Sequence, residues 1–238
     1  MEVPNIDCVA CGVSGCFVKR SSSAGALQQI SRVKKTLKRK SGQALIYSGM
    51  PWNSICFIYQ GKCKVVADGL FGKQQIKRLS KAGDILGLRE LEGDHIAPSS
   101  VYAIEDLYVC SVERETFVQI LLANPEMMLE TLMFVTKELR QSEWRMKNLT
   151  LMNVREKIAY SLLYIQEVFG DLPGGEIDVK LTREEISEVA CTSKELVSRT
   201  LSEFEKEGFL ATEGKKIFLI NKAELMDIIG VNEEVSFA

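Results

Sequence analysis

The sequence has very little histidine and lacks several common catalytic motifs. Its 238 residues include a single histidine, His95, which excludes most histidine-based catalysis. The motifs G-x-x-x-x-G-K-[ST], G-x-S-x-G and H-E-x-x-H are all absent. No run of about 18 apolar residues occurs, so no membrane span is expected. The first residues, MEVPNIDCVACG, also lack the basic start and apolar core of a signal peptide. We therefore expect a cytoplasmic protein that is not an enzyme.

Three of the seven cysteines are concentrated near the N-terminus. Cys8, Cys11 and Cys16 have the spacing C-x2-C-x4-C, and the glycines between them allow the chain to fold back around one metal centre. In a reducing compartment, such cysteines favour metal ligation or free thiols over disulfides. An iron–sulfur cluster and a structural zinc ion both remain open, since each takes four thiolates. A fourth ligand would come from the other cysteines, which are Cys56, Cys63, Cys110 and Cys191.

Short strands are expected between residues 41 and 115. Apolar runs alternate there with glycines, which suit turns. The expected strands are 44–47, 55–59, 62–67, 74–79, 85–87, 99–103 and 107–112. Many short strands spaced in this way predict a small barrel or roll. Before them, residues 21–40 are expected to form an amphipathic helix, with Leu27, Ile30, Val33 and Leu37 on one face and a solvated basic run opposite.

Residues 124–152 have the pattern of one long helix with a narrow apolar seam. Pro125 suits the first turn of a helix. Apolar residues recur in a 4-3 alternation, with Ser142 in the middle position: Met128, Leu132, Val135, Leu139, Met146 and Leu149. A seam sustained for about three heptads is typical of a coiled coil. Its polar flanks favour a partner helix over packing on the same domain, so we expect a homodimer.

The segment from Leu181 to Gly208 predicts two helices joined by a tight turn. Thr182 and Glu185 have the spacing of a capping box at the start of the first helix. The turn falls at residues 190–192, and Thr192 or Ser193 can cap the second helix. A capped helix from Asn153 to about Phe169 precedes this pair. A hairpin around Gly214 and a short helix at 225–229 follow it.

The outward face of the second helix carries residues that can contact bases. Arg199 matches the two acceptors on a guanine edge, and Glu195 can accept from a cytosine amino group. The alternative is an ordinary helical hairpin with a solvated charged face. Charge opposes DNA binding, because residues 153–238 contain 10 Lys and Arg against 17 Asp and Glu. DNA binding would require the few cations to gather on one face.

Together these segments resemble the CRP/FNR family of bacterial transcription regulators. The FNR-branch motif E-x-x-S-R is present as Glu195-Leu196-Val197-Ser198-Arg199, and GQALIYSGM, IYQGKCKVV and AGDILG are similar to the family's cyclic-nucleotide-binding β-roll. The resemblance covers nearly the whole chain and implies an α+β fold in four parts. These are a cysteine-rich segment (1–20), a β-roll sensor domain (21–123), a dimerisation helix (124–152) and a winged helix-turn-helix domain (153–238). One departure is Cys191, where the family usually has glycine in the turn, and a non-glycine residue at positive φ carries strain.

The resemblance also implies a cofactor, partners and site residues. Cys8, Cys11, Cys16 and Cys110 would hold a [4Fe–4S] cluster that responds to oxygen, redox state or nitric oxide. Family members have one more residue between the second and third cysteines. The implied partners are double-stranded DNA, as a palindromic operator with half-sites similar to TTGAT, and RNA polymerase. The implied DNA-binding residues are Arg183, Ser193, Lys194, Glu195, Ser198 and Arg199.

A cyclic nucleotide is not expected in the β-roll. By the resemblance, the acid that binds the ribose hydroxyl falls at about Leu88 and the Arg-Ser pair that binds phosphate at about Ala97-Pro98, and these apolar residues cannot hold an anion. Two alternatives remain. One is a family member with structural zinc or free thiols, with an unknown small-molecule effector. The other is a cytoplasmic metal-binding or electron-transfer protein, which would need neither the E-x-x-S-R motif nor the apolar seam.

Overall fold

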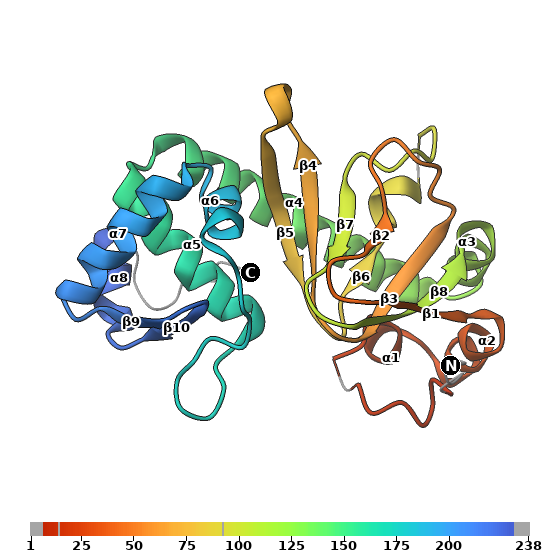
Figure 1. Cartoon of the computed structure of the whole chain (residues 1–238). Coiled ribbons are helices and arrows are strands. Elements are labelled where there is room, and N and C mark those ends of the chain that lie inside the picture. The colour runs from red at the N-terminus through yellow and green to blue at the C-terminus, as the bar shows by residue number, and fades with distance from the viewer. Residues whose placement is uncertain (1–6, 14, 92, 231–238) are drawn as a thin grey trace. The chain divides into compact units, whose positions relative to one another are not determined.

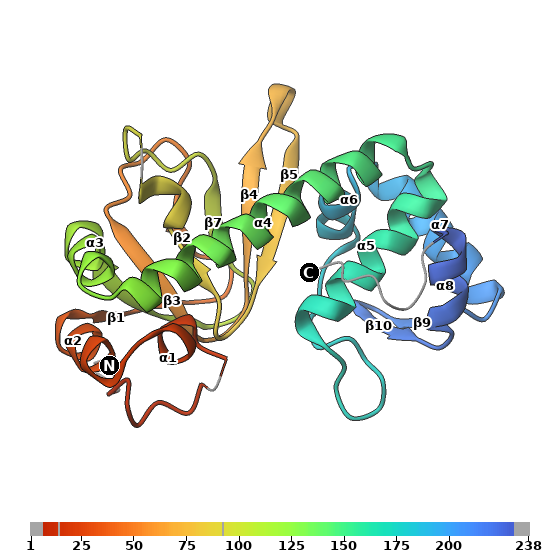
Figure 2. The same cartoon turned by 180° about the vertical axis from the view of Figure 1, so that it is seen from behind.

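The structure is a computed structural model that describes residues 7–13, 15–91 and 93–230 (Figures 1 and 2). The chain divides into two compact units, and the division falls within the longest helix, between Glu138 and Leu139. A short piece of strand β5, Gln74–Ile76, is grouped with the second unit. In the described residues no single helix is long and apolar enough to cross a membrane. Helices α3 (Arg114–Leu122) and α4 (Pro125–Leu151), bent by 116°, meet the length and composition criteria only as a pair.

The first unit contains two four-stranded sheets, with strand orders β1-β8-β3-β6 and β2-β7-β4-β5. The strands of the first sheet are β1 (Lys35–Arg39), β3 (Ser54–Gln60), β6 (Ile85–Leu86) and β8 (Leu107–Glu113). The strands of the second sheet are β2 (Ala44–Ile46), β4 (Cys63–Asp68), β5 (Gln74–Ser80) and β7 (Ser100–Ala103). The unit also contains two short 3-10 helices, η1 (Leu70–Gly72) and η2 (Leu88–Leu91). All seven predicted strands are present to within one residue at each end, so the predicted β-roll is confirmed.

Helices cover one face of the β1-β8-β3-β6 sheet. They are α1 (Phe17–Ser21), α2 (Ala24–Val33), α3 (Arg114–Leu122) and the start of α4 (Pro125–Leu151), as Figures 1 and 2 show. Phe57 of β3 packs in this helix-covered core with Phe17, Ile30 and Phe117. The opposite face of the same sheet packs against the second sheet, in a core that includes Ile58, Val101 and Val109. Alternate residues of β3 and β8 therefore pack into two different hydrophobic cores.

The helix expected over residues 21–40 is wrong beyond Val33. It ends there as α2, and residues 35–39 form strand β1 instead. The reason is tertiary: β1 pairs antiparallel with β8, so that Leu37 lies opposite Val109. Local spacing at 3.6 residues cannot reveal a pairing with a strand 70 residues away. Helices α1 and α3 were not expected from the sequence.

The second unit contains the rest of α4 and a winged helix-turn-helix. Its elements are α5 (Val154–Phe169), α6 (Arg183–Ala190), α7 (Lys194–Lys206), β9 (Leu210–Glu213), β10 (Lys216–Leu219) and α8 (Lys222–Ile228). Capping boxes form at Asn153 with Glu156 and at Thr182 with Glu185, as predicted. Strands β9 and β10 form the expected hairpin. The last helix begins three residues earlier than predicted.

Candidate metal centre and nucleic-acid interface

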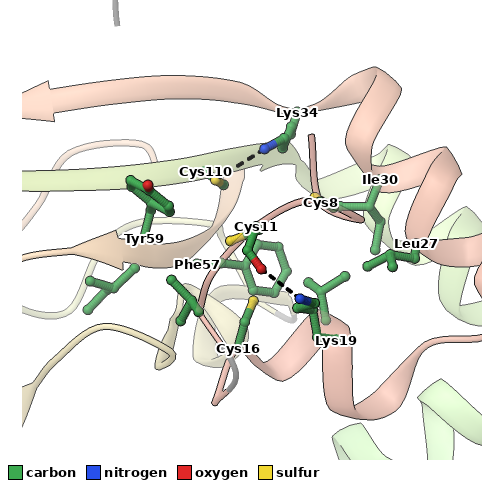
Figure 3. Close-up of a pocket in the computed structure, with 13 residues that line it drawn as sticks. Cys8, Cys11, Cys16, Lys19, Leu27, Ile30, Lys34, Phe57, Tyr59 and Cys110 are labelled. Carbon is green, nitrogen blue, oxygen red and sulfur yellow. Dashed lines mark hydrogen bonds between the residues drawn. The ribbon is translucent and has the colours of Figure 1, made fainter. Parts of the chain in front are cut away.

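Cys8, Cys11, Cys16 and Cys110 line a single pocket in the first unit (Figure 3). The first three belong to the segment that precedes α1, and Cys110 belongs to strand β8. The cavity volume is about 20 Å³, which is enough for about one water-sized sphere. The structure thus brings the four sequence-predicted ligands together, although the N-terminal trio and Cys110 are far apart in the chain.

Strand register explains why Cys110 faces this pocket. In β8, Val109 points into the core between the two sheets, whereas Cys110 and Val112 lie on the helix-covered face. Cys110 stands opposite Thr36 of β1 on one side and Phe57 of β3 on the other. A central strand supported by pairing on both edges gives Cys110 a fixed position against the cysteine segment.

The cysteine segment is fixed by contacts with α2 and with a tight turn. The Cys8 backbone N–H donates to Ser31 Oγ at 3.0 Å, and that hydroxyl donates to Asp7 Oδ1 at 2.8 Å. The Phe17 N–H donates to the Gly83 carbonyl at 3.2 Å. Gly83 has φ of +101°, and a Cβ there would lie 3.0 Å from the backbone of Gly15. A side chain at residue 83 would therefore push the cysteine segment away.

Burial controls the protonation of two of the thiols. Burial raises the pKa of Cys16, and the neighbouring thiols Cys11 and Cys8 raise it further. Burial also raises the pKa of Cys110, while the ammonium of Lys34, with Nζ 3.6 Å from Cys110 Sγ, lowers it. Without metal these two thiols hold their protons, and a bound metal would displace them, because cysteine binds metal as thiolate.

The donor set suits a thiolate-ligated centre. Four cysteines around one cavity match a zinc ion or an iron–sulfur cluster, the two centres that prefer four thiolates. Thr36 Oγ1, beside Cys110 in the sheet, is buried without a hydrogen-bond partner and so retains a donor for a sulfur ligand. Among the described residues, no three potential ligands already stand at metal-binding positions.

The other three cysteines lie elsewhere. Cys56 and Cys63 are buried in the core between the two sheets, where burial raises the pKa of each thiol to about 12. Cys191 lies in the second unit, at the turn between α6 and α7, with φ 50° and ψ 48°. This left-handed conformation is the one that favours glycine, as the sequence indicated.

The turn presents α7 with one face buried and the other exposed. Val197, Leu201 and Phe204 are buried, and Ser193 caps the helix by accepting from the Leu196 N–H at 3.3 Å. Arg183, at the first position of α6, is half-buried. Five of the predicted DNA-binding residues are exposed, and they are Ser193, Lys194, Glu195, Ser198 and Arg199.

Arg199 is held only weakly within the protein. Its side chain is 67% exposed, and its Nε lies 3.9 Å from Glu203 Oε1. Exposed ion pairs of this kind contribute less than about 1 kcal/mol. The guanidinium is therefore available to an external acceptor at little cost. In Glu195, hydrogen bonds from its own backbone N–H and from Ser193 keep the carboxyl pKa low, so this side chain is anionic at neutral pH.

Most of the predicted seam on α4 is exposed in the single chain. Met128, Leu132, Val135, Leu139 and Met146 are between 40% and 68% exposed. Leu149 is different, because it is only 7% exposed and is buried within its own chain. It is therefore removed from the expected seam. Leu129 and Met133, which the heptad analysis did not single out, are also exposed.

Two protein-family models match the chain. A cyclic nucleotide-binding domain matches residues 36–124, and a Crp-like helix-turn-helix domain matches residues 156–228. The two matches coincide with the β-roll and with most of the second unit. They support the fold assignments made from the sequence and place a DNA-binding module in the second unit.

Curated relatives extend over almost the full length. The chain is 28% identical over 234 residues to the fumarate and nitrate reduction regulatory protein of Vibrio cholerae, with 96% of this chain and 92% of that protein covered. It is 25% identical over 236 residues to the protein of that name from Escherichia coli K12, with 97% and 93% covered. Among solved structures, FixK2 from Bradyrhizobium japonicum aligns with a TM-score of 0.75 at 21% identity, covering 84% of this chain and 99% of that one. The structural match shows a shared fold.

Proposed function

The chain belongs to the CRP/FNR family of DNA-binding transcription regulators, and we propose that it is a homodimer whose DNA affinity responds to a cysteine-ligated [4Fe–4S] cluster. The observation that carries the proposal is the single pocket lined by Cys8, Cys11, Cys16 and Cys110. Relatives named for fumarate and nitrate reduction favour oxygen as the stimulus, with general redox state or nitric oxide as related stimuli. When bound, the cluster supplies a redox-active centre.

The residues around the pocket connect the ligands to the long helix. Cys16 is followed directly by Phe17, whose ring lies 5.7 Å from the ring of Phe134 on α4 in an edge-to-face arrangement. Phe134 also lies below the guanidinium of Arg78, which is paired with Glu138 on α4 at 3.1 Å. A change in the position of Cys16 would therefore reach α4 through the contact between Phe17 and Phe134.

Dimer formation would use the exposed seam of α4. Apolar side chains that remain this exposed in a single chain favour pairing with the same helix of a second copy. A twofold dimer presents two α7 helices to two half-sites, and so we infer a palindromic operator with half-sites of the TTGAT type. RNA polymerase is the expected further partner, and the cytoplasm is the expected location because DNA is the target. The apolar Leu88 and Ala97 favour a β-roll that binds no cyclic nucleotide.

Anaerobic purification tests the cofactor directly. We expect a brown protein with four iron and four acid-labile sulfide per chain, and operator binding in a gel shift that is lost after exposure to air. Cys110→Ser should lose the iron, and Cys63→Ala, at a buried thiol outside the pocket, should retain it. Colourless protein with one zinc ion per chain, and operator binding indifferent to air, would establish the structural-zinc alternative instead.

A further inference from the structure

Lys34 is an unusual lysine because it is almost completely buried. Only 5% of the residue is exposed, whereas the adjacent Lys35 is exposed. Lysine is rarely buried unless its charge has a partner, because removing an ammonium from water is costly. Lys34 lines the four-cysteine pocket, and its Nζ lies 3.6 Å from Cys110 Sγ (Figure 3).

Backbone geometry fixes this contact. Lys34 is the C-cap of α2, where its N–H donates to the Ile30 carbonyl at 3.0 Å, and strand β1 begins at the next residue. Thr36 lies opposite Cys110 in the β1–β8 pair. Residues two apart in extended chain point to the same side, so Lys34 and Thr36 both face Cys110. The α2–β1 junction thus supplies one charged and one neutral donor near the same sulfur.

The pocket also contains a second cation with a different partner. Lys19 Nζ donates to the Cys11 carbonyl at 2.6 Å, so its ammonium is directed to the backbone of the cysteine segment. Four thiolates give a bound cluster a net negative charge, which two ammonium groups would offset. The Lys34 ammonium, by contrast, lies beside a ligand sulfur.

We propose that Lys34 is a positioning residue for the metal ligand Cys110: its ammonium holds the sulfur by a charge-assisted hydrogen bond and makes a bound cluster easier to reduce. The inference rests on the proposed cluster. Charge and hydrogen bonds at the sulfurs are among the factors that set cluster potentials. A positive charge beside a ligand stabilises the more negative, reduced form, and hydrogen-bond partners of ligands typically contribute 10–100-fold to metal affinity.

The test compares full-length variants, each reconstituted anaerobically with iron and sulfide. Lys34→Met removes the charge and the donor, Lys34→Gln removes only the charge, Lys34→Arg keeps both, and Lys35→Met is the matched exposed control. We expect Lys34→Met to bind iron 10–100-fold more weakly. We also expect its midpoint potential to fall by an amount equivalent to about a tenfold change in the one-electron equilibrium, or about 59 mV. Lys34→Gln should be intermediate, and the arginine and Lys35 variants should match the wild type within about twofold.

The outcomes separate this inference from the proposed function. A wild-type chain that takes up no iron and sulfide overturns both. A wild-type chain with a cluster overturns only the role of Lys34 if neither neutral variant changes the affinity or the potential. Equally weakened iron binding in every variant, including Lys35→Met and Lys34→Arg, with unchanged potentials of the clusters that do form, would show a general structural effect and would likewise overturn it.

Discussion

Replacing Arg199 by alanine tests the recognition surface without disturbing the fold. The side chain is 67% exposed, and its ion pair with Glu203 is long and solvated. Substitutions at such surface positions usually change the free energy of unfolding by no more than about 0.5 kcal/mol. Any large change in DNA binding therefore reports on the interface itself.

The expected magnitude follows from the contacts that one arginine can make. A guanidinium that donates to both acceptors of a guanine contributes about 1–3 kcal/mol of discrimination. A twofold dimer loses two such contacts, or about 2–6 kcal/mol. At 1.4 kcal/mol per tenfold, this loss weakens specific operator binding by roughly 30-fold to 10⁴-fold. Non-specific binding should weaken far less, because most phosphate contacts remain.

Fluorescence anisotropy at fixed salt measures the effect, with one duplex that carries inverted TTGAT half-sites and one of scrambled sequence. Arg199→Lys keeps the charge but cannot form the bidentate hydrogen bonds of a guanidinium, so it should retain non-specific binding and lose specificity. Glu203→Ala removes the intramolecular partner and should leave operator affinity within about threefold. Operator affinity that survives Arg199→Ala would refute the assignment of this residue as a base reader. An equal loss on both duplexes would make it a phosphate contact.

Three further predictions concern the dimer, the turn and the core. Leu132→Glu should convert the dimer to a monomer in sedimentation velocity, whereas Lys137→Glu, at another exposed position of α4, should leave the dimer intact. A Leu132→Glu protein that remains dimeric would show that the apolar seam of α4 is not the dimer interface. Cys191→Gly should raise the free energy of unfolding by about 0.5–1 kcal/mol. A left-handed non-glycine residue costs about 1–2 kcal/mol, and the greater backbone entropy of glycine in the unfolded chain offsets part of the gain. A lower urea midpoint would contradict this reasoning. Burial raises the pKa of Cys56 and Cys63 from 9.0 to about 12, so these thiols lose their protons first in the unfolded state, and stability should fall as pH rises from 9 towards 12. In Cys63→Ala the urea midpoint should fall less steeply with pH. An unchanged dependence of the midpoint on pH would argue against the pKa shift.

Local features of the fold could be predicted because their causes are local. Thr182 and Glu185 form a capping box three residues apart, and the Ser193 side chain caps the next helix by accepting from the Leu196 N–H. Glycines between short apolar runs marked the ends of the first five predicted strands, from residue 44 to residue 87. The αL conformation at Cys191 was expected from the family resemblance, because relatives usually have glycine at this position of the turn.

Features that depend on distant pairing could not be predicted in this way. Strand β1 carries an amphipathic spacing that also suits a helix, and only its pairing with β8 decides between them. Lys34 stood in a basic run that sequence analysis assigned to a solvated face, but the α2–β1 junction buries it. The residues alone gave no reason to prefer Cys110 over Cys56 as a fourth ligand. Strand alternation makes that choice, since the two thiols lie on opposite faces of one sheet.

The pocket that joins Cys16 to Cys110 also has a consequence for the folding equilibrium. A metal bound by both residues would close a loop of nearly 100 residues through its coordinate bonds, and this loop would constrain the unfolded chain only where those bonds persist. In the chain-entropy treatment of crosslinks, a loop of about 100 residues is worth about 4.7 kcal/mol, a large share of the total stability of a typical domain. Release of the metal would then lower the free energy of unfolding of the β-roll, and the apo chain would unfold more often and be degraded more readily by proteases.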